Sequence, residues 1–359
     1  MVLPALNSVS GINERESKRT LTNEKRSLLP AQGGILMRSL LKITPFANET
    51  PITRASGIAK SGFAEKELGD FAINPALNCG VKCLYCSSDG MLCRLPAYRE
   101  HVGNWWESAS FVPYGNIVEI VDRDAVKLDG RDAEVVLSSV VDPYQARLAS
   151  KSVPRAILER LAPTTLRVRI LTKMVAVVCD LPYVADAFGD RATIGTSIPI
   201  LNPDLSRIIE PFASPVLERQ RRILGTAKEL GLRRFVMGCP IIPGAYQSHH
   251  EFAEAWTKVV GLYEPEKVWF EPLNGRGRNL DVMGQGLREH GPGAVAERVA
   301  RIRAKTGWSE YALELLGWVQ EFARQCYDTS RVRFLLYPTM LTEDARRQVE
   351  ADDACVLWL

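Results

Sequence analysis

The sequence predicts an α/β protein in which strands and helices alternate along most of the chain. Six short apolar runs between residues 71 and 272 fit buried strands, and helical segments separate most of them. Five of the runs end in polar or proline-rich residues. This alternation favours a parallel sheet, and six strands predict a partial (β/α)6 barrel of the TIM type, with an active site at the carboxyl ends of the strands. A doubly wound open sheet is the competing fold, but no G-x-G-x-x-G follows any run.

The elements follow from local sequence signals. Ser214-Pro215 offers an N-cap and a proline at the first helical position, and Gly231 ends the same helix. Asp142-Pro143 ends the second strand. The predicted strands are 71–75, 134–140, 167–173, 192–198, 234–242 and 267–272, and the predicted helices among them are 146–161, 182–188, 214–230 and 249–262.

Two further parts flank this core. We predict an N-terminal extension over 1–65, the barrel over 66–280, and an α+β addition over 281–359. The extension contains no cysteine and carries runs of mixed charge, which are typical of a solvated arm. The C-terminal addition contains apolar periodicity for helices near 292–304 and 309–326 and for strands near 332–337 and 355–358.

Composition fits an ordinary soluble enzyme. The chain has 359 residues, 46% hydrophobic content and a net charge of +3, which neither requires nor excludes a nucleic-acid partner. No apolar run approaches the roughly 18 residues of a membrane helix, and the first residues lack the features of a signal peptide. Cysteines outside one cluster show no pattern, which suits a reducing compartment. We therefore expect a cytoplasmic protein without a membrane partner.

The clustered cysteines are Cys79, Cys83 and Cys86, spaced C-x3-C-x2-C with Tyr85 before the last. Cysteine thiolates hold iron–sulfur clusters, and three of them leave one iron of a [4Fe–4S] cluster open for a ligand. A zinc site is an alternative, with Cys93 as its fourth ligand seven residues after Cys86. Ordinary unligated thiols are a third interpretation.

The spacing resembles that of radical S-adenosylmethionine (SAM) enzymes, and other segments resemble their spore photoproduct lyase-like branch. The resemblance covers about 70 to 280 and keeps the family order. Its most specific parts are Asp142-Pro143-Tyr144-Gln145 and Pro240-Ile241-Ile242-Pro243-Gly244. The other matching segments are Asn74-Pro75, Leu171-Thr172-Lys173, Ser197-Ile198, 202–206, Glu210-Pro211, Ser214-Pro215, Glu218-Arg219 and Glu271-Pro272-Leu273-Asn274.

The resemblance implies two cofactors, a [4Fe–4S] cluster on the three cysteines and SAM at its open iron. It also implies reductive cleavage of SAM to a 5'-deoxyadenosyl radical that abstracts a hydrogen atom. Lys173 and Ser197 would bind the carboxylate of SAM, while Ser139 and Asp142 would lie near its amino group. Met237 would lie near the adenosine, and Tyr85 belongs to the same expected site. A flavodoxin or ferredoxin would supply the electron.

The chain also departs from that branch. Spore photoproduct lyase uses a further cysteine downstream of the triplet, but no cysteine occurs here between Cys93 and Cys179. Cys239 and Cys93 are the remaining candidates for a hydrogen donor. Lyase chemistry on a nucleic-acid lesion is one expectation, and modification of a small molecule or peptide is the alternative. A non-catalytic iron–sulfur carrier or sensor is a third, although a carrier needs no SAM pocket.

Two further features bear on a nucleic-acid substrate. Trp105-Trp106 and the arginines Arg276 and Arg278 have side chains that stack on a displaced nucleotide or contact its phosphates. The interpretation that we favour is structural: the tryptophans anchor a loop to the barrel, and the arginines belong to a glycine-rich turn.

Overall fold

The computed structural model describes residues 43–350 and 355–359. Nine strands form one mostly parallel sheet, which confirms the predicted α/β fold class. The six predicted strands lie side by side in chain order, each parallel to the next, so their carboxyl ends meet at one end of the sheet. They are β3 (Phe71–Ile73), β5 (Glu134–Leu137), β6 (Arg167–Leu171), β7 (Ala192–Ser197), β8 (Arg233–Ile241) and β9 (Lys267–Pro272).

Short strands extend the sheet at both edges. On one side β2 (Ala59–Lys60) pairs antiparallel with β3, and on the other β10 (Val332–Leu336) and β11 (Val356–Trp358) continue parallel to β9. A separate pair joins β1 (Asn48–Glu49) and β4 (Ser110–Phe111). The predicted N-terminal extension lies outside the described residues as far as residue 42. The division at 65 and 280 stays a prediction.

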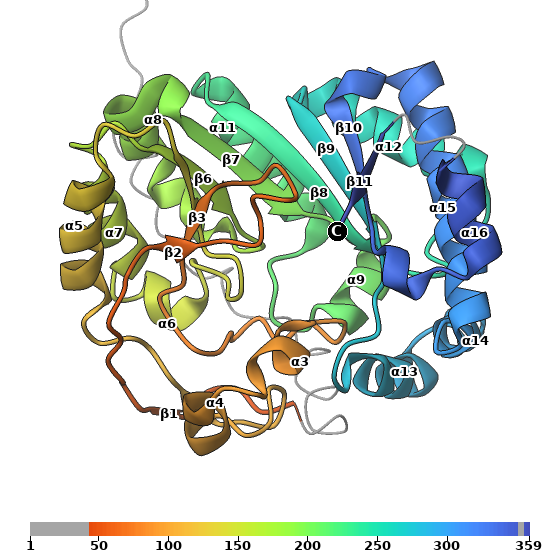
Figure 1. Cartoon of the computed structure of the whole chain (residues 1–359), viewed down its shortest axis with the longest axis horizontal. Helices are drawn as coiled ribbons and strands as arrows, with labels where there is room; N and C mark the ends of the chain where they lie inside the picture. The colour runs from red at the N-terminus through yellow and green to blue at the C-terminus, as the bar shows by residue number, and fades with distance from the viewer. Residues whose placement is uncertain (1–42, 351–354) are drawn as a thin grey trace, which may run out of the picture.

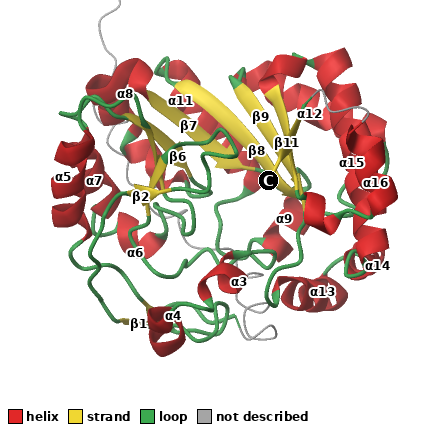
Figure 2. Cartoon of the chain, viewed as in Figure 1, coloured by secondary structure: helices red, strands yellow, loops and turns green. Residues whose placement is uncertain are grey.

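Helices flank the sheet on two sides, and a third group lies near the carboxyl ends of the strands (Figures 1 and 2). The first side has α5 (Ile117–Leu128), α7 (Val153–Leu161) and α8 (Leu181–Phe188), and the other has α12 (His249–Tyr263), α15 (Lys305–Cys326) and α16 (Glu343–Glu350). The third group contains α3 (Ser88–Leu92), α4 (Pro96–His101) and α13 (Asn279–His290). The remaining α-helices of the described residues are α6 (Ala146–Ala149), α9 (Pro203–Ile209), α10 (Val216–Glu218), α11 (Gly225–Glu229) and α14 (Gly293–Arg301).

Alternate residues of the strands face two different environments. Val236 and Val268 belong to the large apolar cluster that the α12 and α15 side chains complete. Phe235 and Trp269 face the other way and form a small interior cluster. Leu68, from the segment between β2 and β3, belongs to that interior cluster too. The concave side of the sheet is therefore filled by side chains, as in a partial barrel.

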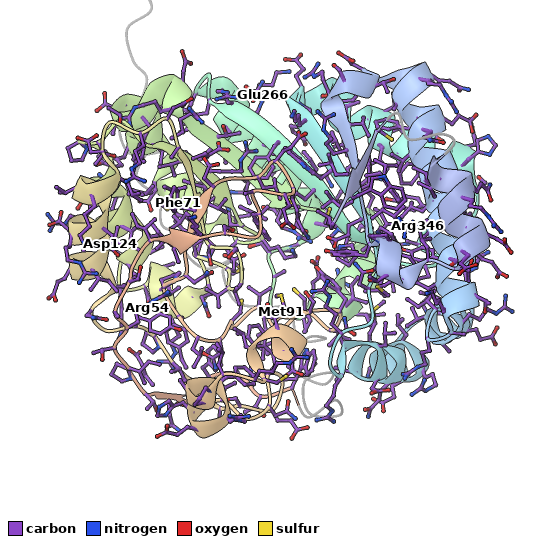
Figure 3. All side chains as sticks on the ribbon, in the orientation of Figure 1. Arg54, Phe71, Met91, Asp124, Glu266 and Arg346 are labelled. Carbon is purple, nitrogen blue, oxygen red and sulfur yellow. The ribbon has the colours of Figure 1, made fainter. Side chains whose placement is uncertain are left out.

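The segment before β2 is fixed to the helix layer. Asp124 of α5, labelled in Figure 3, accepts hydrogen bonds from the backbone N–H groups of Gly57 at 2.8 Å and Ile58 at 3.4 Å. Burial alone would raise the pKa of Asp124, but these donors and Arg123 lower it to about 2. The carboxylate is therefore charged near neutral pH and holds this segment on α5.

Two predicted helices differ from the observed ones. The helix over 146–161 is broken into α6 and α7, because Ser152 has φ of +53° and Pro154 has no N–H to continue the first helix. The helix over 214–230 divides into α10, a π-helical turn over Arg219–Leu224, and α11. Ser214 is not its N-cap, because the Ser214 hydroxyl accepts the N–H of Val175 at 3.0 Å instead.

Gly195 of β7 provides a test of how closely the interior is packed. A Cβ at Gly195 would lie 2.4 Å from the ring of Phe235 on β8, its paired residue. We expect Gly195→Ala to lower the free energy of unfolding by roughly 1–3 kcal/mol, as overpacking does in other cores. Gly261→Ala is the control, because Gly261 is exposed in α12 and a Cβ added there would have nothing within 4 Å. Alanine should stabilise that helix. Urea unfolding measures both, and equal effects would contradict the packing argument.

Candidate functional site

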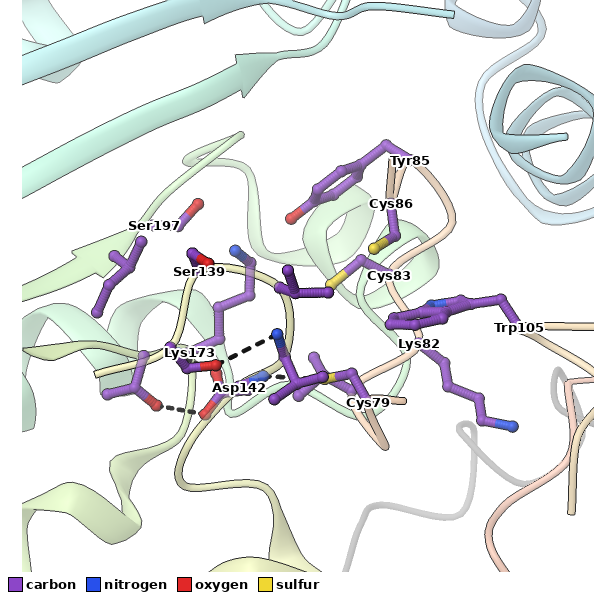
Figure 4. Close-up of a pocket in the computed structure, with 16 residues that line it drawn as sticks. Cys79, Lys82, Cys83, Tyr85, Cys86, Trp105, Ser139, Asp142, Lys173 and Ser197 are labelled. Carbon is purple, nitrogen blue, oxygen red and sulfur yellow. Dashed lines mark hydrogen bonds between the residues drawn. The ribbon is translucent and has the colours of Figure 1, made fainter. Parts of the chain in front are cut away.

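The three clustered cysteines lie on the loop between β3 and α3, at the carboxyl end of the first central strand. Cys79 and Cys83 are buried and Cys86 is partly buried. All three line one cavity of about 600 Å³ (Figure 4). The structure therefore brings together the residues predicted to hold a metal cofactor, although nothing in the chain itself shows which metal they hold.

Neighbouring side chains hold the loop in place. Lys82 has φ of +47°, and its buried ammonium donates to three backbone carbonyls, those of Thr44, Trp106 and Ser108, at 2.5–3.1 Å. Burial lowers the pKa of Lys82 to about 8. Gln145 accepts the N–H of Gly80 at 2.6 Å. The cysteines are thus presented by a loop whose backbone is tied to the surrounding protein.

The environment of the thiols favours their neutral form when no cation is bound. Burial raises the pKa of Cys79 to about 12 and also raises the pKa values of Cys83 and Cys86. Binding as thiolates therefore requires compensating positive charge, which iron or zinc supplies.

In residues 43–350 and 355–359, no three His, Cys, Asp or Glu side chains are arranged to hold a single metal ion.

Cys93 lies apart from this group. It is exposed at the end of α3, where its thiol donates to the carbonyl of Gly90 at 3.4 Å. It lines neither the cysteine cavity nor the larger cavity described below. Cys239 does line the larger cavity, and its thiol lies 3.5 Å from the carbonyl oxygen of Trp269. Of the two candidate hydrogen donors, only Cys239 therefore faces the site.

Asp142 connects the cysteine loop to the ends of β5 and β6. Its carboxylate accepts hydrogen bonds from the Thr172 hydroxyl at 2.7 Å, the Lys173 N–H at 2.7 Å and the Tyr144 N–H at 2.9 Å. Its own N–H donates to the sulfur of Cys79 at 3.2 Å. Asp142 is therefore a structural junction as well as a lining residue of the cysteine cavity.

A buried ion pair lies behind Lys173. Glu210 and Arg219 are both fully buried, and the Arg219 guanidinium donates to the Glu210 carboxylate and to the carbonyl of Ser197 at 2.7 Å. The Tyr85 hydroxyl also donates to Glu210. Burial would raise the pKa of Glu210, but Arg219 and Lys173 outweigh it and lower the pKa.

Lys173 has unused hydrogen-bonding capacity. Its Nζ lies 3.9 Å from Glu210, and within the described residues it makes no hydrogen bond. Ser139 accepts from the Asn74 side chain at 3.1 Å and keeps its own hydroxyl proton. The Ser197 hydroxyl donates to the carbonyl of Cys239 at 2.9 Å, so it must rotate before it can donate to a ligand.

A larger cavity of about 970 Å³ adjoins the cysteine cavity. Five of the predicted site residues line both cavities and so lie on the boundary between them: Tyr85, Cys86, Ser139, Lys173 and Ser197. Met237, the predicted adenosine neighbour, lines the larger one. Four further polar lining residues were not assigned a role from the sequence: Lys66, Glu271, Asn274 and Tyr337. Tyr337 directly follows β10, Lys66 lies in the segment between β2 and β3, and the fold brings both to this cavity.

Neither Trp105 nor Trp106 exposes a ring face on which a base could stack. Both are buried, and the Trp106 indole donates to the carbonyl of Cys83 at 3.1 Å, in agreement with the anchoring interpretation. Trp105 lines the cysteine cavity, and its buried Nε1–H has no hydrogen-bond acceptor in the described part of the chain. Arg276 lines the larger cavity, where its guanidinium lies 5.0 Å from the centre of the Tyr337 ring. Arg278 is exposed on the same turn.

Sequence comparison gives a partial match only. Uncharacterised proteins of Mycobacterium bovis and Mycobacterium tuberculosis are 25% identical over 129 residues, which is 36% of this chain and 38% of those proteins. The match thus spans well under half the length of these curated relatives. No protein-family model matches the chain. None of the described helices has the length and apolar character needed to cross a membrane.

Structural comparison gives a match across most of the chain. A spore photoproduct lyase complexed with dinucleoside spore photoproduct covers 89% of this chain and 93% of its own, with a TM-score of 0.55 and 14% identity. A variant with bound AdoMet (SAM) and dinucleoside spore photoproduct matches at a TM-score of 0.55 and 13% identity. A second variant reaches a TM-score of 0.56. The chain therefore has the fold of spore photoproduct lyase, a partial TIM-type barrel.

Proposed function

We propose that the chain is a radical SAM enzyme. Its [4Fe–4S] cluster, when bound, supplies one electron that splits SAM into methionine and a 5'-deoxyadenosyl radical, which then abstracts a hydrogen atom from a substrate. The observation that carries the proposal is the convergence of Cys79, Cys83 and Cys86 with Lys173 on one cavity at the carboxyl ends of parallel strands. The resemblance in sequence order and the shared fold support it.

The residues present fit such a cluster. Three thiols from one loop line the same cavity, and the indole N–H of Trp105, also lining it, lacks an acceptor. An unpaired buried donor is unfavourable, and cluster sulfur is an acceptor that would satisfy it. The N–H of Asp142 already donates to the Cys79 sulfur, which stabilises that sulfur as a thiolate.

The residues also fit SAM. Lys173 offers ammonium protons that no protein group accepts in the described chain, and a carboxylate is their natural partner. Glu210 and Arg219 position this end of the cavity: Glu210 attracts Lys173 and holds the Tyr85 hydroxyl. We propose that Ser139 lies near the amino group, with Asp142 fixing the loop behind it, and that Met237 contacts the adenosine.

For the substrate we propose a nucleic-acid lesion, by analogy with the dinucleoside photoproduct named in the structural neighbours. The larger cavity provides space beside the SAM residues, and Arg276 supplies a cation on its wall. Cys239, which lines that cavity, is the proposed hydrogen donor. A small molecule or peptide is the alternative substrate, because apolar and aromatic side chains, Met91 of α3 and Tyr337, also line the cavity.

The chemistry requires a one-electron donor of low potential. We propose a flavodoxin or ferredoxin as that partner and the cytoplasm as the location, since thiol ligands and a reduced cluster suit a reducing compartment.

The test of the proposal is anaerobic reconstitution with iron and sulfide, followed by SAM and dithionite. We expect Cys83→Ala to lose the cluster absorbance, the bound iron and the formation of 5'-deoxyadenosine. Cys93→Ala is the matched control and should keep all three, because Cys93 lies outside the cavity. Equal loss in both variants would show that Cys93 is a fourth ligand, so that no iron is left open for SAM. If the reconstituted wild type forms no 5'-deoxyadenosine, the radical SAM proposal is rejected and a non-catalytic iron–sulfur carrier or sensor is the interpretation that remains.

Lys173→Met tests the proposed carboxylate contact. A charge-assisted hydrogen bond contributes about 1.5–3 kcal/mol, so SAM affinity should fall by roughly one to two orders of magnitude. Equilibrium dialysis with the reconstituted protein measures this, and circular dichroism checks the fold. Unchanged affinity in a folded variant would refute the assignment.

Trp105→Phe tests the proposed hydrogen bond to the cluster. Hydrogen bonds to cluster sulfurs favour the more negative reduced state, so removing one should lower the reduction potential. A redox titration followed by electron paramagnetic resonance measures it. Trp105→His keeps a ring N–H and should restore part of the shift. An intact cluster with the wild-type potential in Trp105→Phe would show that this indole does not donate to it.

A further inference from the structure

Lys82 is a buried charged residue that the proposed chemistry does not use. It directly precedes Cys83 in the cysteine loop, is 1% exposed and lines the cysteine cavity. Figure 4 shows its ammonium end pointing away from the three sulfurs. The charge therefore lies behind the loop, whereas Lys173, the proposed SAM contact, lines both cavities.

The groups around the Lys82 ammonium are polar but carry no net charge. Its three protons go to the backbone carbonyls of Thr44, Trp106 and Ser108, and the ring centre of Phe46 lies 4.7 Å from Nζ. Within the described residues, no carboxylate lies at ion-pair distance from this nitrogen. Lys82 is thus a buried cation that is fully hydrogen-bonded but has no counter-ion among the described protein groups.

The other buried cations in the described part of the chain do have one. Arg169 forms an ion pair with Glu134 at 2.9 Å, and Arg219 forms one with Glu210. Burying a charge is strongly unfavourable unless it is both hydrogen-bonded and paired. A neutral amide could donate to two of the same carbonyls at lower cost, so anchoring the loop does not by itself explain a charged residue here.

The cluster proposed for Cys79, Cys83 and Cys86 would supply the missing negative charge. A [4Fe–4S] cluster on three thiolates carries a net negative charge, and net charge is one of the factors that set its reduction potential. Lys82 belongs to the loop that would hold this cluster. Cys79 is also the ionisable group of the described chain whose charge raises the pKa of Lys82, so the ammonium and the thiols are close enough to interact.

We propose that the Lys82 ammonium is the buried counter-charge of the cluster and raises its reduction potential, which favours the one-electron reduction that starts the reaction. The inference rests on the proposed function, since it assigns a role to this chain's own residue toward the cluster of that site. Lys82 does not touch SAM or a substrate, so it acts through the cluster and is not a catalytic residue.

The direction of the effect follows from charge alone. Reduction adds one negative charge to the cluster, and a fixed positive charge nearby stabilises the reduced state more than the oxidised one. Across roughly 10 Å of protein, where screening by water is weak, one unit charge changes such an equilibrium by about tenfold. A tenfold change corresponds to about 59 mV for a one-electron couple.

The experiment is a redox titration of the reconstituted protein without SAM, followed by electron paramagnetic resonance. Lys82→Gln keeps N–H donors for the carbonyls but removes the charge, and Lys82→Met removes both. We expect both uncharged variants to have a potential lower by about 59 mV or more. Lys82→Arg keeps the charge and should show less than half of that drop. Circular dichroism checks the fold of each variant.

Lys258→Gln is the matched control. Lys258 on α12 also carries one positive charge, but it is exposed and pairs with Glu254 at 2.8 Å. Its charge is screened by water and salt, so this variant should keep the wild-type potential. An equal drop in Lys258→Gln would mean that the total charge of the protein, not the position of Lys82, sets the potential, and would overturn the proposal.

The other outcomes also decide. Loss of the cluster in the uncharged variants but not in Lys82→Arg supports the proposal, because the anionic cluster then needs the charge to be held. An intact cluster at the wild-type potential in either uncharged variant overturns it. The same drop or loss in Lys82→Arg also overturns it and makes Lys82 a structural anchor of the loop.

Failure of the proposed function is distinguishable from these results. A wild type that forms no iron–sulfur cluster overturns both proposals. A wild type whose cluster responds to Lys82 as expected, but which forms no 5'-deoxyadenosine with SAM and dithionite, overturns the radical SAM proposal and leaves the role of Lys82 standing.

Discussion

The carboxylate of Asp142 connects the parts of the chain on which the candidate site depends. It accepts two hydrogen bonds from Thr172 and Lys173 at the end of β6, while its own N–H contacts the sulfur of Cys79. A parallel sheet brings the strand ends to one side, but it does not by itself set the distances between their loops. Asp142 sets one of these distances, since a shift of the β6 end would be transmitted to the cysteine loop. Its role as a junction explains why an acidic residue is buried here.

The buried Glu210–Arg219 ion pair also joins separate segments, since Arg219 donates to the carbonyl of Ser197 at the end of β7. Burying two charges is energetically more costly than burying the single carboxylate of Asp142. Two charges buried together are tolerated only when their hydrogen bonds are satisfied, and removing one partner from such a pair typically costs about 3–5 kcal/mol. Here Tyr85 and Ser206 also donate to Glu210, whereas Arg219 Nε has no acceptor in the described residues. Arg219 opens the π-helical turn between α10 and α11. The irregular turn and the buried pair therefore occur together directly behind Lys173.

The sequence predicted the central strands well, because each is a buried apolar run with a sharp polar end. The C-x3-C-x2-C spacing predicted three thiols on one short loop, and the structure places that loop between β3 and α3. Helix α5 went unpredicted, although Ile117, Ile120, Val121 and Leu128 have helical spacing. The junction of Lys66, Glu271 and Tyr337 could not be predicted from periodicity, since it joins residues 205 and 271 positions apart. Such contacts depend on how the segment before β3 enters the concave side of the sheet.

Unsatisfied polar atoms distinguish the candidate site from the equally polar structure around it. Asp142 and Lys82 are buried and extensively hydrogen-bonded by protein groups, so their hydrogen bonds are complete within the chain. Lys173 Nζ, Trp105 Nε1 and Asn274 Oδ1 make no hydrogen bond in the described residues. Other buried atoms also lack partners, among them Tyr246 Oη and Trp256 Nε1, but those lie in the apolar cluster and line neither cavity. An unpaired group in a packed core is a local cost. Two unpaired atoms and the Lys173 ammonium, whose ion-pair partner Glu210 lies 3.9 Å away, instead surround two joined cavities and form a complementary surface. Lys173 offers a cation, Trp105 an N–H donor and Asn274 an acceptor, each at a separate place on this surface. The surface therefore fits two or more ligands bound together better than it fits a single small one.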